Sequence, residues 1–513
     1  MPRDLRHQRL ASLAHPPLRL ALPALALAAL AFTGCTPSGP PAGGGAKAEG
    51  EAKAAAKAEV EAKVEAAPEP VSTAVGAVEL AVIPGYGVVD AARLPGELDL
   101  LIRLRGDETA AKGERPALDL AVVLDRSGSM VGDKILAVKQ ASLDLLKDLQ
   151  PRDRITLLSY SDDVIVHAER ITADAQGVDV VRGHLLPINA DGGTALGPGM
   201  VRGLEILEAA KRPEQDLAHV LLLSDGQANV GESRPDVLGA RAAEAFKKGV
   251  SVSTLGVGLD YNEDLMTKLA DQGGGRYHVI PDNQAIPRVL ADEFAGLVAT
   301  VASGMSLELR LGPGVEVVKV FGYPSAQEGG STRVRVGSLA AAQDREIVVR
   351  VRLPAASGEQ IAVGVVAVDF TDLTRAGERG PAEVALSIPV SKDPEAVRRA
   401  ENTEVTVRVA EVESAAQLEA ATRAMAEGNY DQAKQMIQSN IDGLQVLQKK
   451  APSAKLAEQI ADLEQAAQGV ESARESGEEM KKFQKLYKSK AYSKGKGAAP
   501  SSKKSKPVPA PLP

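Results

Sequence analysis

The chain has 513 residues, of which 44% are apolar and 25% are charged, a composition typical of globular proteins. This length is too great for one hydrophobic core and predicts two to four domains. The net charge of −8 excludes a protein that binds nucleic acid over its whole surface. The single cysteine, Cys35, excludes a disulfide framework and a cysteine-based zinc site.

Residues 1–34 have the pattern of an export signal, in which a basic start precedes a short Leu/Ala-rich run. The run ends in small residues before Cys35 and resembles a bacterial lipoprotein signal, although Phe32 stands where such signals usually have leucine. The resemblance implies a lipid anchor on Cys35 in the cell envelope. Thr36 favours the outer membrane if the host is Gram-negative. The alternative is a plain signal peptide with an incidental cysteine.

Residues 35–70 form the predicted tether. A Pro/Gly/Ala stretch is followed by alternating Ala, Glu and Lys, with favourable pairs four residues apart such as Glu49 with Lys53. This pattern predicts a semi-rigid helical spacer, about 1.5 Å long per helical residue, and a disordered tether is the alternative.

Two kinds of pattern follow. Residues 71–116 alternate with period 2, as Leu98, Leu100 and Ile102 do, and predict β-strands. Residues 117–300 alternate apolar strands with helices, which predicts a doubly wound, Rossmann-like α/β domain whose parallel sheet is covered on both faces. The expected strands cover 118–124, 155–159, 164–168, 220–223, 250–257 and 276–280, and the expected helices cover 134–149, 178–186, 203–211, 235–248, 262–271 and 285–301.

Residues 301–391 return to short alternating strands between Gly/Pro turns and predict a β-sandwich. Strands from residues 71–105 are expected to join this sandwich, so that the α/β domain is inserted into it or flanked by it.

The C-terminal part is predicted to be helical over residues 392–490. One stretch, 424–433, looks like half of a tetratricopeptide hairpin, but a plain antiparallel helical pair is preferred. Residues 491–513 are lysine- and proline-rich and predict a disordered basic tail. Such a tail is either simply solvated or touches anionic lipid, envelope polymer or nucleic acid.

The residues most informative about chemistry follow the first apolar strand. Asp125, Ser127 and Ser129 form a D-x-S-x-S loop. Two hydroxyls at i and i+2, with a carboxylate two residues earlier, can converge on one hard cation, for which oxygen ligands are preferred. Because the hydroxyls are neutral, the ion stays under-neutralised and can accept an anionic ligand from outside.

Two further loops belong to the same pattern. Thr194 lies in a glycine-rich loop that precedes a helix, and Asp225 ends another buried strand. Their offsets from Asp125 are 69 (194 − 125) and 100 (225 − 125). Each loop follows an apolar strand or precedes a helix, so all should lie at the carboxyl edge of the sheet, where open α/β sheets bind ligands.

The three loops look like the metal-ion-dependent adhesion site of von Willebrand factor A domains, over roughly residues 117–300. The resemblance implies that Ser127 and Ser129 bind Mg²⁺ directly, with Mn²⁺ as the alternative ion. It implies that Thr194 binds directly or through water. Asp125 and Asp225 would act through water and by orienting the hydroxyls. A vacant coordination position would accept an Asp or Glu side chain of a partner protein.

The order of strands, A domain and β-sandwich is similar to that of bacterial secreted A-domain proteins and, more distantly, of inter-alpha-trypsin inhibitor heavy chains. The resemblance implies a metal-dependent, adhesion-type binding module on the cell envelope. One alternative is a scaffold that assembles through the C-terminal helices. A metal-dependent hydrolase is less favoured, because Gly-x-Ser-x-Gly, Walker and His-Glu-x-x-His motifs are absent and Asp191 is the one candidate general base.

Overall fold

The structure is a computed structural model, and it describes residues 68–109, 115–355 and 358–497. The predicted signal, the lipidation site at Cys35 and most of the tether lie outside the described residues, as do residues 498–513. None of the helices in the described ranges combines the length and the hydropathy needed to cross a bilayer.

The α/β domain is built on a six-stranded sheet in the order β10-β9-β8-β5-β6-β7. Its strands are β5 (Leu118–Asp125), β6 (Arg154–Tyr160), β7 (Val164–Thr172), β8 (Leu217–Ser224), β9 (Val250–Val257) and β10 (Gly274–Ile280). All neighbours are parallel except β6 and β7, which are antiparallel. The expectation of a fully parallel sheet is therefore wrong at this edge, because three residues between two strands allow only a hairpin.

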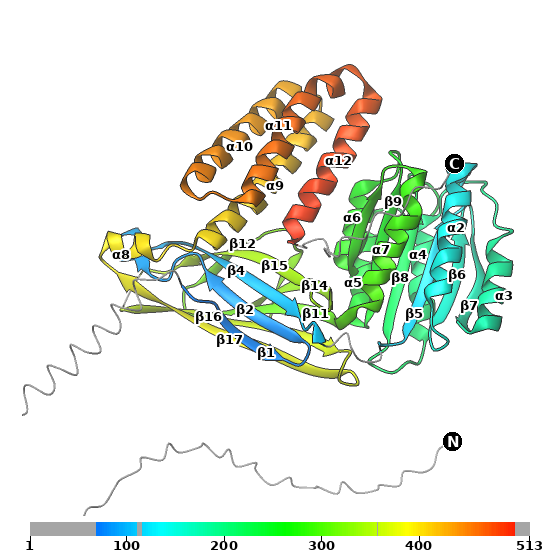
Figure 1. Cartoon of the computed structure of the whole chain (residues 1–513), viewed down its shortest axis with the longest axis horizontal. Helices are drawn as coiled ribbons and strands as arrows, with labels where there is room; N and C mark the ends of the chain where they lie inside the picture. The colour runs from blue at the N-terminus through cyan, green and yellow to red at the C-terminus, as the bar shows by residue number, and fades with distance from the viewer. Residues whose placement is uncertain (1–67, 110–114, 356–357, 498–513) are drawn as a thin grey trace, which may run out of the picture. The chain divides into compact units, whose positions relative to one another are not determined.

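Helices cover both faces of this sheet (Figure 1). Buried side chains of α2 (Asp133–Asp148), α3 (Ala175–Leu185) and α7 (Ile286–Val298) share one core with the sheet, and those of α4 (Leu196–Ala209), α5 (Pro235–Lys247) and α6 (Glu263–Gln272) share the other. Every residue of β5 and β8 is buried, which explains why both strands are mostly apolar, with Asp119 and His219 as buried exceptions. The doubly wound α/β class predicted from the sequence is confirmed.

Helix α4 begins at Leu196, seven residues before the predicted start at 203 (203 − 196). Glycine and proline within its first turns hid the start from sequence analysis, because both residues disfavour helix interiors. The glycines permit close packing instead. A Cβ atom on Gly199 would lie 2.7 Å from the ring of Tyr160.

Two further sheets form the β-sandwich. One has the order β1-β2-β4-β15-β12, and the other has the order β13-β14-β11-β16-β17-β3. The strands are β1 (Val71–Val75), β2 (Val78–Pro84), β3 (Val89–Asp90), β4 (Gly96–Gly106), β11 (Thr300–Leu311), β12 (Glu316–Val320), β13 (Ser325–Glu328), β14 (Ser331–Ala340), β15 (Asp344–Leu353), β16 (Gln360–Asp372) and β17 (Glu378–Ser391). Their inner faces share one apolar core. The chain leaves the sandwich after β4 and returns at β11, so the α/β domain is inserted into it.

The C-terminal region is larger than the predicted helical pair. After α8 (Pro394–Arg399), four long helices follow: α9 (Thr403–Ala426), α10 (Tyr430–Lys450), α11 (Ala454–Glu475) and α12 (Gly477–Lys496). They share a core of their own. Helix α12 continues to Lys496, so residues 491–496, which were expected in a disordered tail, are helical because they pack against the rest of the protein.

Helix α9 attaches this bundle to the sandwich. Its residues Val405, Val409 and Val412 lie against Ile83 and Leu101 of the sandwich. This apolar contact is reinforced by ion pairs at the same place.

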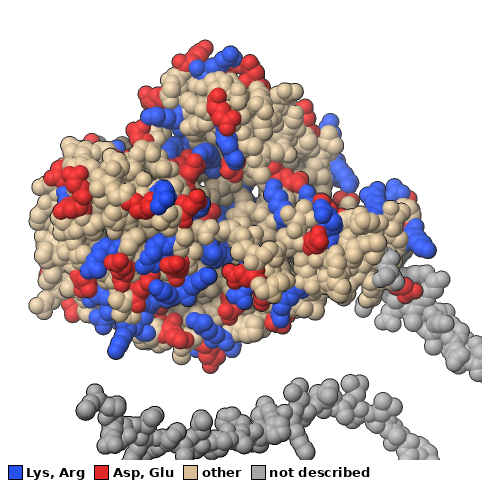
Figure 2. Space-filling view, turned by 180° about the vertical axis from the view of Figure 1, so that it is seen from behind, with Lys and Arg blue, Asp and Glu red and all other residues tan. Residues whose placement is uncertain are grey.

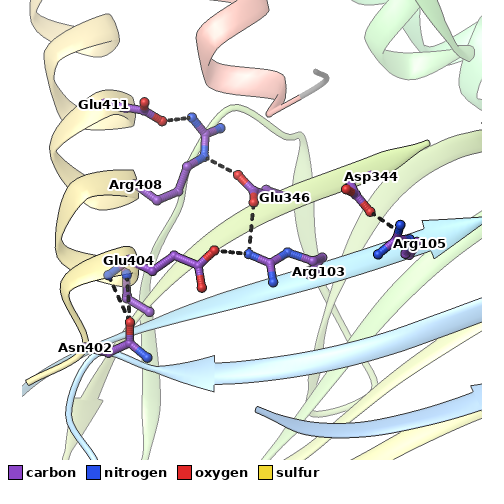
Figure 3. Close-up of polar contacts among 9 residues, drawn as sticks. Arg103, Arg105, Asp344, Glu346, Asn402, Glu404, Arg408 and Glu411 are labelled. Atoms are coloured by element: carbon purple, nitrogen blue, oxygen red, sulfur yellow. Dashed lines mark hydrogen bonds and ion pairs between the residues drawn. The ribbon is translucent and has the colours of Figure 1, made fainter. Parts of the chain in front are cut away.

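Figure 3 shows these ion pairs between α9, β4 and β15. Glu346 lies 3.2 Å from Arg103 and 3.3 Å from Arg408, and Arg103 also pairs with Glu404. The Arg408 side chain is only 5% exposed, and a second carboxylate, Glu411, lies 2.9 Å from it. A buried guanidinium between two carboxylates fixes the direction in which the bundle leaves the sandwich.

Charged side chains of both signs are interspersed over the face of the protein seen in Figure 2. No extended field of one sign forms on that face, in keeping with the modest net charge of −8.

A buried ionic cluster lies in the α/β domain around Glu293 of α7. Its carboxylate accepts hydrogen bonds from Ser253 (2.6 Å) and His278 (2.7 Å) and pairs with Arg276 (2.8 Å). Burial alone would raise the pKa of Glu293, but Arg276 and His278 outweigh it and hold the pKa well below its usual range. His219, 2% exposed, lies 3.8 Å from the same carboxylate, and burial lowers its pKa to about 4.

This cluster predicts a loss of stability on acidification. Because the folded pKa of His219 lies near 4 and its ordinary value is 6.5, the unfolded chain binds more protons between these pH values. The unfolding free energy should therefore fall as the pH drops from 6.5 to 4, by up to about 3 kcal/mol from this residue. Urea unfolding of the His219→Gln variant should show a smaller pH slope than wild type. The Ser142→Ala change, which removes no titratable group, should leave the slope unaltered, and an equal slope in all three proteins would contradict the prediction.

Candidate metal centre

The first metal-site loop follows directly from the end of β5. Asp125 is the last residue of that strand and is fully buried, and Ser127 and the short turn η3 (Gly128–Met130) come next. The Ser127 amide donates to Asp125 Oδ1 at 2.8 Å, which turns the loop back over the strand end. Ser127 Oγ and Ser129 Oγ consequently lie 3.0 Å apart.

This separation agrees with the geometry of a divalent cation. In an octahedral Mg²⁺ site with metal–oxygen distances of about 2.1 Å, adjacent ligand oxygens lie about 3.0 Å apart. The two serine hydroxyls show that spacing in the protein itself. All five predicted site residues present oxygen atoms, the ligand type that Mg²⁺ and Mn²⁺ prefer.

Asp225 joins this loop from the neighbouring strand. β8 pairs with β5, and Asp225 comes directly after it. Its Oδ1 accepts a 2.6 Å hydrogen bond from Ser129, and Ser224 donates to Asp125 Oδ2 at 2.8 Å. The two strand ends are thus joined through carboxylate–hydroxyl bonds. Asp225 thereby orients the Ser129 hydroxyl, while Asp125 holds the Ser127 amide and the Ser224 hydroxyl.

Thr194 enters from the third loop. It is 4% exposed, its amide donates to Asn229 Oδ1 at 2.8 Å, and its carbonyl accepts from the Asn229 amide at 3.2 Å. A Cβ atom on Gly226 would lie 3.4 Å from both Thr194 Oγ1 and Ser129 Oγ. Both hydroxyls therefore face the same glycine, and the structure brings the three predicted loops together.

The electrostatics of the centre are set by buried carboxylates. Burial raises the pKa of Asp125, and hydrogen bonds from Ser127 and Ser224 act in the opposite direction. Asp225, only 1% exposed, pairs with the ammonium group of Lys134, which also donates to the Ser129 carbonyl at 3.3 Å. The centre thus holds the carboxyl groups of Asp125 and Asp225 beside one ammonium group. When both carboxyl groups are ionised, negative charge is in excess, which favours the binding of a cation.

Arg126, the residue between Asp125 and Ser127, ties the loops together. Its guanidinium pairs with Asp163 at 2.5 Å and with Asp191, although its own side chain is only 12% exposed. Its carbonyl also accepts from the Asp191 amide at 2.7 Å. The carboxylate of Asp191, the one candidate general base in these loops, is therefore held by Arg126.

Sequence analysis missed three contributors to this centre. Arg126 was visible only as the variable position of the motif, and Lys134 lies on the first turn of α2 with no motif of its own. The Tyr160 hydroxyl donates to the Leu223 carbonyl (2.7 Å) and lies 3.3 Å from Asp125 Oδ2. Only the position of Tyr160 at the end of a neighbouring strand could have suggested it.

A metal site made of histidine, cysteine or carboxylate ligands finds no support elsewhere. Within the described ranges, no group of three or more His, Cys, Asp or Glu side chains is placed to hold an ion. The hydroxyl-rich centre at the carboxyl edge of the α/β sheet is therefore the candidate.

Sequence comparisons point to the same domain. The family model of the von Willebrand factor type A domain matches residues 119–292. The uncharacterized protein YfbK of Escherichia coli strain K12 is 30% identical over 235 residues, which are 45% of this chain and 39% of that protein. Inter-alpha-trypsin inhibitor heavy chain H4 of Sus scrofa is 32% identical over 157 residues, 30% of this chain and 17% of that protein. The chain spans less than half the length of either relative.

The fold extends the likeness beyond that domain. A solved von Willebrand factor type A protein from Catenulispora acidiphila is similar to 79% of this chain, with 91% of its own chain covered, a TM-score of 0.61 and 18% identity. The ArnB paralog VWA2 from Sulfolobus acidocaldarius is similar over 80% of this chain and 98% of its own, with a TM-score of 0.52 and 18% identity. At this identity the likeness concerns the fold alone.

Removal of one hydroxyl should weaken Mg²⁺ binding. The Ser129→Ala variant should lose at least about tenfold in affinity, the lower bound found when groups that support metal ligands are changed. Isothermal titration of the full chain measures this. Ser142→Ala removes a buried hydroxyl of the same kind from α2 and should bind Mg²⁺ as wild type does. Equal affinity of Ser129→Ala and wild type would show that the hydroxyl is no ligand.

The loop-tying role of Arg126 predicts an effect that charge does not explain. Arg126→Lys keeps the positive charge, but an ammonium group cannot span Asp163 and Asp191 as a guanidinium does. Mg²⁺ affinity should fall by about fivefold, the equivalent of one exposed ion pair. Amide exchange should rise in residues 189–195. Arg182→Lys, in the exposed pair with Asp179, is the matched control, and unchanged exchange in Arg126→Lys would refute the role.

Proposed function

Since residues 119–292 form a von Willebrand factor type A domain, we propose that this chain is a metal-dependent protein-binding module displayed on the bacterial cell envelope. Domains of this family are typically metal-dependent interaction modules. The observation that carries the proposal is the arrangement of three side chains at the carboxyl edge of the sheet. Ser127 Oγ lies 3.0 Å from Ser129 Oγ, which in turn lies 2.6 Å from Asp225 Oδ1.

The residues divide their roles as follows. In this proposal Ser127, Ser129 and Thr194 supply neutral oxygens, while Asp225 accepts a hydrogen bond from the Ser129 hydroxyl and Asp125 accepts one from the Ser127 amide. A bound Mg²⁺, or Mn²⁺ as the alternative, offers a vacant coordination position to a carboxylate oxygen. The proposed ligand is therefore an Asp or Glu side chain of a partner protein.

The rest of the chain presents this site. A lipid on Cys35 would anchor the chain in the membrane, and the spacer over residues 35–70 would hold the folded body away from it. If the host is Gram-negative, the outer membrane is the favoured location. The composition of residues 1–70 supports this part of the proposal. The basic tail would contribute weak contacts with anionic envelope polymers.

The two alternative functions are less supported by the geometry. A hydrolase needs a free general base near the metal, and the candidate, Asp191, is paired with Arg126. A scaffold that assembles through its C-terminal helices needs an open helical surface. Part of that surface is already used, because Val405 and Val409 of α9 cover the sandwich.

The proposal predicts that capture of an acidic partner depends on both the metal and Thr194. The full chain, immobilised and incubated with envelope extract, should retain partner proteins in Mg²⁺, lose them in EDTA and regain them when Mg²⁺ is restored. Thr194→Ala should lose at least about tenfold in partner retained, since a metal-site oxygen is gone. Quantitative mass spectrometry of the eluates measures this.

A matched control is available on the same domain. Thr172 is an exposed threonine at the end of β7, where it pairs with the first residue of β6, far from the metal loops. Thr172→Ala should capture partners as wild type does. Capture that survives EDTA, or that survives Thr194→Ala in a folded protein, would contradict the proposed function.

A further inference from the structure

Helix α12 lies beside α6 of the α/β domain (Figure 1), and a row of polar side chains joins the two helices. Lys481 pairs with Asp260 at 2.6 Å and Lys488 pairs with Asp264 at 3.0 Å. Near the end of the helix, Asp271 accepts a hydrogen bond from Tyr492 at 2.8 Å and pairs with Lys496 at 2.8 Å. The α12 residues in these contacts are spaced three to four residues apart, or multiples of this spacing, so they share one face of the helix.

Lys485 lies in the middle of this face, and its side chain is buried between α12 and the α/β domain. Its side chain is 10% exposed, its ammonium group lies 3.5 Å from the centre of the Tyr261 ring, and it donates to the Tyr261 carbonyl at 2.9 Å. Burial lowers the pKa of Lys485 to about 8, against the pull of Glu263 at 3.7 Å. Because this buried ammonium group contacts both the ring and the carbonyl of Tyr261, it fixes the position of Tyr261 relative to α12.

The residues that α12 holds are neighbours of the metal loops. Asp260 and Tyr261 form the connection between β9 and α6, and the side chain of Gln227 donates to the Asp260 carbonyl. Gln227 lies two residues after Asp225. The Tyr261 ring also lies close under β9, since a Cβ atom on Gly256 would be 2.3 Å from it. The connection is thus held by α12 on one side and supports the Asp225 loop on the other.

The opposite face of α12 belongs to the helical bundle. Met480, Phe483 and Tyr487 are buried in the bundle core. The end of the helix is fixed to α9, because Arg408 donates to the Lys494 carbonyl at 2.7 Å. The helix therefore transmits the position of the whole bundle to the β9–α6 connection.

We propose that α12 is a positioning element of the metal centre: through Lys481 and Lys485 it sets the β9–α6 connection, and through Gln227 it orders the loop that carries Asp225. The inference rests on the proposed function, and it gives the C-terminal bundle a role in that function. Neither lysine touches the metal ligands. Both act through Asp260 and Tyr261.

A charge swap tests the proposal. Lys481→Asp and Asp260→Lys each break the contact, whereas the double variant restores a pair of opposite charges and leaves the net charge of wild type. If charge alone mattered, the two single variants would change the Mg²⁺ affinity in opposite directions. Lys481→Asp adds negative charge near the metal, and Asp260→Lys removes it. If the contact positions the loop, both single variants should lower the Mg²⁺ affinity.

Amide exchange in the metal-free full chain is the first measurement. Both single variants should exchange faster than wild type in residues 224–230 and 258–262, and the swap should return toward wild type. The second measurement is Mg²⁺ titration, in which the swap should bind more tightly than the mean of the two single variants on a logarithmic scale, by up to about fivefold. Lys485→Met, which keeps the apolar stem, should also exchange faster in both segments.

Lys482 supplies the matched control on the same helix. It pairs only with Glu478 and Glu479 among the described residues, both on α12, so Lys482→Asp should leave exchange in the two segments unchanged. Unchanged exchange of residues 224–230 in Lys481→Asp, Asp260→Lys and Lys485→Met would overturn the proposal. A charge swap whose effect on exchange equals the sum of the two single effects would overturn it as well. A wild-type chain that binds no Mg²⁺ would instead refute the proposed function, because the exchange experiment needs no metal.

Discussion

The burial of two carboxylates at the ends of neighbouring strands is the constraint on which the candidate metal centre depends. Asp125 follows the interior of β5 and Asp225 follows β8, and both are almost fully shielded from solvent. A buried carboxylate is costly unless hydrogen bonds and opposite charge compensate it. The hydroxyls of Ser129 and Ser224 and the ammonium of Lys134 provide that compensation. The bond to Asp225 also holds the Ser129 hydroxyl, which lies 3.0 Å from the Ser127 hydroxyl.

Much of this centre could be read from the sequence because its parts follow regular elements. The mostly apolar strands placed Asp125 and Asp225 at one edge of a sheet, and local spacing placed Ser127 and Ser129 beside the first carboxylate. The class of the α/β domain followed from the alternation of strands and helices. Such signals are local, since each depends on residues within one strand, one turn or one helix.

What the sequence could not provide are contacts between side chains far apart along the chain. Arg126 pairs with residues 37 and 65 positions away, and Lys481 pairs with an aspartate 221 positions away. A lysine-rich segment read by itself resembles a solvated tail, and contacts with α6, α9 and α11 turn part of it into a packed helix. The antiparallel β7 and the early start of α4 were missed for related reasons, because a short hairpin and closely packed glycines override average preferences.

The distant contacts also restrict how the α/β domain can move relative to the rest of the protein. An inserted domain is connected by two chain crossings, which alone would permit it to rotate on its host. Strand β14 approaches β10 so closely that a Cβ atom on Gly337 would lie 2.3 Å from the Gly274 carbonyl. Helix α12 adds a second attachment, at α6 and the connection before it. Attachment at two separated places opposes rotation, so a force applied at the candidate metal centre would pass into the sandwich and the bundle together.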